Sequence, residues 1–149
     1  MTAIVGETGA GKSTVMKLLA RFYQPSGGKI IVDSVPLEDI EIRSYRSQVA
    51  FVPQEPFLFS TTIEANIAYG KQDATKEEIE AAARRVGAHE FIRKLDGGYY
   101  RKVGVQGRAL SSGQKQLISL ARAEIMKPKL LLKIRKVLGG QKLPDSGSF

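Results

Sequence analysis

The stretch GETGAGKS, residues 6–13, decides the fold that this sequence predicts. It matches the pattern G-x-x-x-x-G-K-[ST], in which a glycine-rich loop joins a strand to a helix. An apolar strand, residues 2–5, precedes it, and a helix from Thr14 to about Tyr23 is expected to follow. Such a loop binds phosphate, because its backbone N–H groups and the positive end of the helix point at the anion.

This loop predicts a site for a nucleoside triphosphate. Lys12 is expected to reach the β and γ phosphates, and the Ser13 hydroxyl is expected to bind Mg²⁺. The predicted nucleotide-binding residues of the loop are Gly6, Glu7, Thr8, Gly9, Ala10, Gly11, Lys12, Ser13 and Thr14. The alternative is a glycine turn that merely begins a helix. Nucleotide kinases, GTPases and transport ATPases share the pattern, so it does not choose among them.

The chain then alternates strand and helix before it becomes helical. Residues 29–33 (KIIVD) and 49–52 (VAFV) read as strands, with a short helix at 42–48 between them. Beyond Pro56, Thr75 and Glu78 have the spacing of a capping box. The apolar residues of the helix that follows recur at helical spacing: Ile79, Ala82, Ala83 and Val86.

The longest predicted helix runs from Ser111 to Met126. Its expected core stripe is Leu117, Leu120, Ala121 and Ile125. We therefore expect an α/β core of residues 1–55 and 125–132, with a helical subdomain inserted at 56–124. Residues 133–149 read as a divergent, basic, turn-rich tail.

Composition excludes several classes of function. The chain has 149 residues, no cysteine and one histidine, His89, so disulfides and cysteine metal sites are ruled out, and His89 is expected to have a surface or packing role. No apolar run reaches the about 18 residues that span a bilayer. The net charge is +8, but no basic stripe interleaved with aromatic residues is present, so nucleic acid is not favoured as a partner.

Two further segments narrow the class. ALSSGQKQLISLARA, residues 109–123, resembles the signature sequence of ABC transporter ATP-binding domains, whose usual form is L-S-G-G-Q. FVPQEPFLFSTTIEANIAYG, residues 51–70, resembles the loop around that family's γ-phosphate-sensing glutamine, in its exporter branch. With the phosphate loop, the resemblance covers about residues 1–132. It implies a P-loop NTPase of the ABC ATPase type, with a three-layer core that is partial here.

The resemblance also assigns roles. It implies that Gln54 contacts Mg²⁺ and the attacking water, whereas a glutamine between two prolines is otherwise a common surface residue. The signature residues would bind the ATP held by the opposite subunit of a head-to-tail pair: Ser111, Ser112, Gly113 and Gln114. Ser112 replaces the family's first glycine. From the residues alone, S-x-x-Q predicts only a capped helix.

Partners follow from the same resemblance. Residues 55–69, with the aromatic residues Phe57, Phe59 and nearby Tyr69, would meet the transmembrane domain of an exporter; the alternative is that these rings belong to the core. We expect a soluble chain attached to the cytoplasmic face of a membrane through that partner. Val105 or Gln106 stands where exporters carry a glutamate in a contact loop. The transported substrate cannot be read from these residues.

One expected motif is missing. The family continues four apolar residues with Asp-Glu, but here the strand Leu130 to Lys133 is followed by Ile134 and Arg135, so no catalytic residue is identified. Arginine stays protonated and neither holds Mg²⁺ nor polarises water. The only acid after Glu124 is Asp145, no switch histidine follows, and the adenine-stacking aromatic would lie upstream of Met1.

These features leave four hypotheses. The first is an ABC exporter ATP-binding domain, truncated at both ends or frameshifted near residue 133, that binds ATP with Mg²⁺ and hydrolyses it poorly. The second is a non-catalytic partner that lends its signature helix to another subunit's site. The third is a non-functional fragment, since a lost strand would expose sheet edges. The last is a P-loop kinase outside the ABC family, which leaves ALSSGQKQ unexplained.

Overall fold

The computed structural model describes residues 10–133. The predicted strand at 2–5, the loop residues Gly6 to Gly9 and the positions Ile134 and Arg135 lie outside the described residues. The described elements, in chain order, are α1 (Lys12–Leu19), β1 (Ile31–Val32), β2 (Val35–Pro36), α2 (Ile42–Ser47), β3 (Val49–Val52), α3 (Ile63–Ala68), α4 (Lys76–Arg85), α5 (His89–Lys94), the 3₁₀ turns η1 (Gly98–Tyr100) and η2 (Val105–Gly107), α6 (Ser112–Glu124) and β4 (Leu130–Lys133).

The strands β3 and β4 form a parallel pair although 77 residues separate them. Val49 faces Leu130 and Val52 faces Lys133 in the register, which confirms both predicted strands. Because parallel strands need a long crossover, the chain between them is free to carry the helical segment. In sequence, the segment from α3 to α6 is therefore inserted between two strands that are neighbours in one sheet.

The predicted strand at 29–33 is wrong in its length. Only Ile31–Val32 pairs, and it pairs with Val35–Pro36, an antiparallel partner that the sequence did not predict. Asp33 and Ser34 join the two strands with positive φ angles of 48° and 69°. A two-residue turn with both φ values positive matches the twist of a hairpin, and Asp tolerates it well.

Helix α1 is shorter than the prediction of a helix reaching Tyr23. It ends at Leu19, and Arg21, two residues later, takes a left-handed φ of 54°. The Arg21 amide then donates to the Leu18 carbonyl and the Phe22 amide to the Lys17 carbonyl. These are the two hydrogen bonds of a Schellman motif, which glycine usually forms. Because position 21 is arginine rather than glycine, the sequence did not indicate the end of the helix. The predicted helix therefore extended too far.

The helices α3 to α6 enclose the larger hydrophobic core. The predicted face of α4 is confirmed, with Ile79, Ala82 and Ala83 buried and Val86 packed against them. In α6, however, Ile118 is fully buried, whereas Leu117 is only partly buried. The predicted stripe was too narrow, because α6 packs against α3 and α4 on one side and against β3 on the other.

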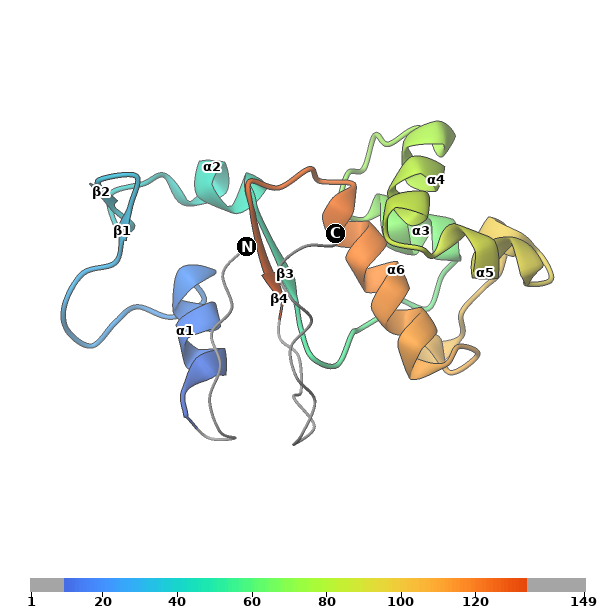
Figure 1. Ribbon diagram of the computed structural model, residues 1–149, viewed down its shortest axis with the longest axis horizontal. Coiled ribbons are helices and arrows are strands. Elements are labelled where there is room, and N and C mark those ends of the chain that lie inside the picture. Colours follow the sequence, from blue (N-terminus) through green and yellow to red (C-terminus); the bar gives the residue numbers. More distant parts are fainter. Residues whose placement is uncertain (1–9, 134–149) are drawn as a thin grey trace, which may run out of the picture.

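Figure 1 shows four ends directed toward one edge of the molecule. The N-terminal end of α1, the carboxyl ends of β3 and β4, and the N-terminal end of α6 all point downward in that view. In open α/β sheets, ligands bind outside the carboxyl ends of the strands. The fold thus orients the predicted phosphate-binding helix and the predicted signature helix toward the edge where such sites form. Within residues 10–133, no helix is both long enough and apolar enough to cross a membrane.

Candidate functional site

The N-terminal end of α1 begins at a glycine and has no acidic residue in its first turn. Gly11 precedes the helix with φ 76°, a left-handed conformation that glycine adopts without strain. Gly11 provides no side-chain cap. The first N–H groups of a helix have no partners within the helix, and the helix dipole makes this end positive. Ala10, Lys12, Ser13 and Thr14 lie at this end, with the Ser13 side chain exposed.

The N-terminal end of α6 is capped by its own side chains. The Gln114 amide donates to Ser111 Oγ at 3.2 Å, and the Ser111 amide donates to Gln114 Oε1 at 2.9 Å. This is the predicted capping box. It satisfies the Gln114 amide. Ser111, Ser112 and Gly113 are all exposed at this helix end.

Nothing among the described residues 10–133 requires glycine at position 113. A Cβ placed there would approach nothing closer than Ser111 Oγ at 4.0 Å, and its φ angle is not positive. Glycine weakens a helix by about 1 kcal/mol relative to alanine. A glycine that neither packing nor backbone conformation requires is consistent with close approach of a ligand from outside the chain.

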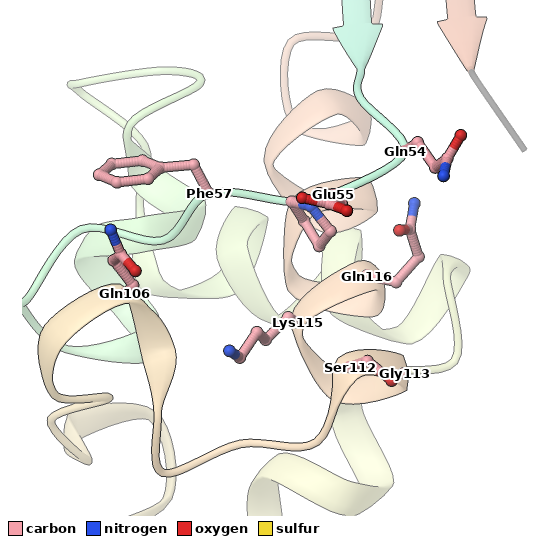
Figure 2. Close-up of a pocket in the computed structure, with 9 residues that line it drawn as sticks. Gln54, Glu55, Phe57, Gln106, Ser112, Gly113, Lys115 and Gln116 are labelled. Atoms are coloured by element: carbon pink, nitrogen blue, oxygen red, sulfur yellow. The ribbon is translucent and has the colours of Figure 1, made fainter.

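Gln54, Ser112 and Gly113 line one cavity of about 670 Å³, whereas Ser111 and Gln114 do not line it. Its walls are the loop after β3, the turn η2 and the start of α6 (Figure 2). Gln116 extends from α6 toward Gln54, and Lys115 lies between α6 and the segment that carries Gln106 (Figure 2). The lining residues are Gln54, Glu55, Pro56, Phe57, Gln106, Ser112, Gly113, Lys115 and Gln116.

The cavity does not include every predicted residue. Lys12, Ser13 and Thr14 belong to α1 and do not line it. Conversely, Glu55, Lys115 and Gln116 line it but were not predicted. Lys115 and Gln116 lie three positions after Ser112 and Gly113, so the helix places them on the same face, toward the cavity. Gln106, at the position where exporters carry their contact loop, has φ 52° within η2 and lines the far wall.

An aromatic face lies beside this cavity. We define it by Phe57, Phe59 and Tyr69, whose rings form a chain with centroid distances of 5.2 Å and 4.5 Å. Phe57 is 52% exposed and Tyr69 is 60% exposed, while Phe59 is partly buried. The core alternative is therefore wrong for Phe57 and Tyr69. Exposed aromatic clusters of this kind mark contact surfaces.

Arg122 of α6 contacts two rings of the aromatic face. Its guanidinium carbon lies 5.3 Å from the Phe59 ring centroid and 5.7 Å from that of Tyr69. Burial lowers the pKa of Arg122 from its usual value, but arginine remains protonated. Sequence reasoning missed this residue, because an arginine in an amphipathic helix reads as solvent-facing.

The predictions for His89 and Lys133 concern residues outside the cavity. His89 has the predicted packing role: it is buried, and its Nδ1 lies 2.9 Å from the Tyr99 hydroxyl. Burial raises the pKa of Tyr99 to about 12, so its hydroxyl stays protonated. Lys133 lies in β4 as predicted and is partly buried. Within residues 10–133, no group of three His, Cys, Asp or Glu side chains is arranged to hold a metal ion.

The fold and this arrangement define a class, a P-loop NTPase of the ABC ATPase type. The family model described as ABC transporter matches residues 1–133, and the chain belongs to that family. A solved structure of a bacterial Atm1-family ABC exporter with ATP bound superposes with a TM-score of 0.82 and 41% sequence identity. That match covers 85% of this chain and 22% of the exporter chain. The predicted fold class and family are confirmed.

Its curated relatives are ABC transporters of plants and bacteria. ABC transporter B family member 19 of Arabidopsis thaliana is 51% identical over 130 residues, which are 87% of this chain and 10% of that protein. A multidrug efflux ATP-binding/permease protein of Mycobacterium bovis is 48% identical over 128 residues, or 86% of this chain and 11% of that protein. The chain therefore spans about a tenth of the length of these two relatives.

Proposed function

We propose that this chain is the ATP-binding part of an ABC exporter and holds ATP with Mg²⁺ at the N-terminal end of α1. The phosphates would meet the loop Gly6 to Thr14, with Lys12 beside the β and γ phosphates. Ser13 and Gln54 would supply oxygen ligands to Mg²⁺, which suits a hard cation that prefers oxygen. The bound metal would neutralise phosphate charge, and this chain's own groups would bind and orient the nucleotide.

The observation that carries this proposal is the shared orientation of α1 and α6. The uncapped, positively polarised end of α1 and the capped end of α6 face the same edge (Figure 1). Exposed Ser112 and Gly113 are presented outward, as a head-to-tail pair of subunits would require. In such a pair, Ser111 to Gln114 would contact the ATP of the opposite subunit. The boundaries of the core and of the helical subdomain at 56–124 stay part of this proposal.

We expect ATP hydrolysis by this chain to be impaired. The position after β4 carries Ile134 and Arg135 in place of two carboxylates. An arginine beside the terminal phosphate would attract the phosphate but could not accept a proton from water at neutral pH. We therefore expect this chain to bind ATP but to hydrolyse it slowly.

Isothermal titration calorimetry tests the binding proposal. MgATP should release heat with the wild-type chain and little or none with Lys12→Ala. Lys17→Ala is the matched control, because Lys17 belongs to the last turn of α1 and lies over the Tyr23 ring. Equal heat for wild type and Lys12→Ala, or no heat for a folded wild-type chain, would contradict the proposal.

A phosphate-release assay tests the impairment. The wild-type chain should show less than about 1% of the turnover of an acid-bearing ABC ATPase domain, since loss of a catalytic base typically costs 10²–10⁴-fold. Turnover at the level of an intact domain that disappears in Lys12→Ala would contradict impaired hydrolysis while leaving binding intact.

A second candidate function rests on the intact end of α6. The capping box and the unobstructed Gly113 are preserved although the carboxylates are absent. The chain would then act as a non-catalytic partner that completes the ATP site of an acid-bearing subunit. Titrating it into such a subunit should raise turnover, and Ser111→Ala should weaken the increase. Turnover that stays constant across the titration would exclude this role.

The aromatic face is the surface proposed to meet the transmembrane domain. Phe57 and Tyr69 are exposed on the same side of α6 as its supporting residue Arg122. Because aromatic anchors dominate many protein interfaces, their exposure fits a docking site. This contact would hold the chain at the cytoplasmic face of a membrane.

A further inference from the structure

The contacts of Arg122 link two surfaces that are otherwise separate. On one side is the aromatic face of Phe57, Phe59 and Tyr69; on the other is the end of α6 at Ser111 to Gln114. Arg122 belongs to α6, yet every hydrogen bond of its guanidinium group reaches the segment that carries the aromatic face. The guanidinium group therefore fastens α6, the helix that begins at the signature end, to the segment that carries the aromatic face.

The guanidinium group binds three oxygens of that segment. Nε donates to the Asn66 carbonyl at 2.8 Å, Nη1 to the Phe57 carbonyl at 3.0 Å, and Nη2 to Asn66 Oδ1 at 2.7 Å. The fork of arginine donors allows all three bonds at once, which a lysine ammonium group cannot reproduce in the same plane. The rings of Phe59 and Tyr69 lie over the same group.

Asn66 extends this connection into the loop. It is fully buried, and all its polar atoms are used. Its Oδ1 also accepts from the Phe59 amide at 2.9 Å, while its Nδ2 donates to the carbonyls of Phe59 and Thr62. The Phe59 backbone is thus held from both sides by one side chain, which is in turn held by Arg122. A displacement of the loop would have to break several buried hydrogen bonds at once.

The end of α3 depends on the same arginine. The Gly70 amide donates to the Ile67 carbonyl rather than to Asn66, so the Asn66 carbonyl would be unpaired at the helix end without Arg122. Gly70 also allows backbone contact between the helices, because a Cβ there would lie 2.1 Å from the Arg122 carbonyl. The end of α3 and the last turn of α6 are therefore expected to move together.

The rest of α6 can transmit such a movement. From Gln114 to Glu124 the helix contains neither glycine nor proline, and such a helix bends little. Arg122 lies nine positions after Gly113, which corresponds to about 14 Å along the axis. A tilt imposed at Arg122 is therefore expected at the signature end.

We propose that Arg122 is a positioning residue that couples the aromatic face to the signature end of α6. A transmembrane partner seated on Phe57 and Tyr69 would shift Ser111 to Gln114 through Arg122 and the rigid helix. This inference rests on the proposed function for the identity of the partner and of the ligand at the helix end. The coupling within the chain can be measured without either of them.

Hydrogen–deuterium exchange of the nucleotide-free chain tests the coupling in four forms: wild type, Tyr69→Ala, Arg122→Lys and the double variant. Tyr69→Ala removes an exposed ring and should speed exchange in residues 112–118 by roughly threefold, the equivalent of one cation–π contact. Arg122→Lys should speed exchange by about tenfold in both 57–69 and 112–118, because charge-assisted hydrogen bonds are lost. In the double variant, Tyr69→Ala should add nothing further at 112–118.

The matched control is Arg85→Lys. Arg85 also holds α6, through Glu124 at 2.7 Å, but is not part of the aromatic face. In this background, Tyr69→Ala should keep its threefold effect on residues 112–118. Exchange in α5, which carries none of these substitutions, serves as the internal reference, because a merely structural loss of stability would accelerate α5 equally.

Three results would overturn the proposal. They are an unchanged effect of Tyr69→Ala in the Arg122→Lys background, acceleration of α5 equal to that of 112–118, and loop exchange that changes while 112–118 does not. If Arg122→Lys shows no cooperative thermal transition, Phe59→Leu replaces it, since it removes one ring from the guanidinium group and keeps all three hydrogen bonds. It should then reduce the Tyr69→Ala effect at least by half. Calorimetry with MgATP reports separately on the proposed nucleotide site, so the two failures are distinguishable.

Discussion

The helical segment and the strand-bearing segment of this chain are buried to very different degrees. The helices α3 to α6 enclose thirteen buried residues in one continuous cluster. Around β3 and β4 the corresponding cluster contains Ala50, Val52 and Ala123. Leu131, in a parallel strand, is 47% exposed although parallel strands are usually covered on both faces. The helical segment therefore carries its own core, and the strands depend on whatever else packs on them.

The sharpest test of this difference compares two aliphatic residues. Ile118 is 0% exposed in the helical core, and Ile118→Ala should lower the free energy of unfolding by about 3 kcal/mol. Leu131→Ala should lower it by about 1 kcal/mol or less, because half of that side chain already contacts solvent. Urea denaturation followed by circular dichroism measures both. Equal losses would show that the two segments do not differ in the way their burial indicates.

A second test uses two glycines. Gly70→Ala places a Cβ against the Arg122 carbonyl and should destabilise the chain by about 2 kcal/mol. Gly27→Ala, which meets nothing within 4 Å and needs no positive φ, should change the stability by less than about 0.5 kcal/mol. Thermal unfolding separates the two variants. A tolerated Gly70→Ala would mean that α3 and α6 are not in close backbone contact.

The third test separates stability from the proposed binding role at α6. Gly113→Ala should leave the chain slightly more stable, by about 0.5 kcal/mol, because alanine favours the helix and meets no clash. The same variant should reduce stimulation of an acid-bearing partner. Chemical denaturation and the turnover assay give the two readings. A destabilised variant would contradict the absence of an internal role for Gly113.

The smallest expected effect concerns acid. The hydrogen bonds from Lys71 and from the Thr75 amide lower the pKa of Glu78 below its usual 4.5. Glu78 therefore stabilises the chain above about pH 4.5, and this contribution disappears as the pH falls through the lowered value. The difference in stability between Glu78→Gln and wild type should therefore become smaller below pH 4.5. Lys71→Met should weaken the same pH dependence, and an unchanged acid transition in both variants would show that this pair adds nothing.

The predictions succeeded where the signal was local. The capping boxes at Thr75 and Ser111 and the strand β4 depend on residues a few positions apart, so their patterns are visible in the sequence. The end of α1 was missed because Arg21 takes a conformation that glycine usually signals. The N-cap of α2 was missed because it is Glu41, whose carboxylate accepts from the amides of Arg43 and Ser44.

By itself the sequence determined the family, the ordered motifs and the absence of carboxylates at Ile134 and Arg135, since each is a matter of which residue stands at which spacing. Only the tertiary structure decided that Gln54 shares a cavity with Ser112 and Gly113, and that Arg122 turns inward to hold Asn66. These pairs lie more than fifty residues apart. Their contacts depend on how α6 packs between α3 and β3, which no local pattern specifies.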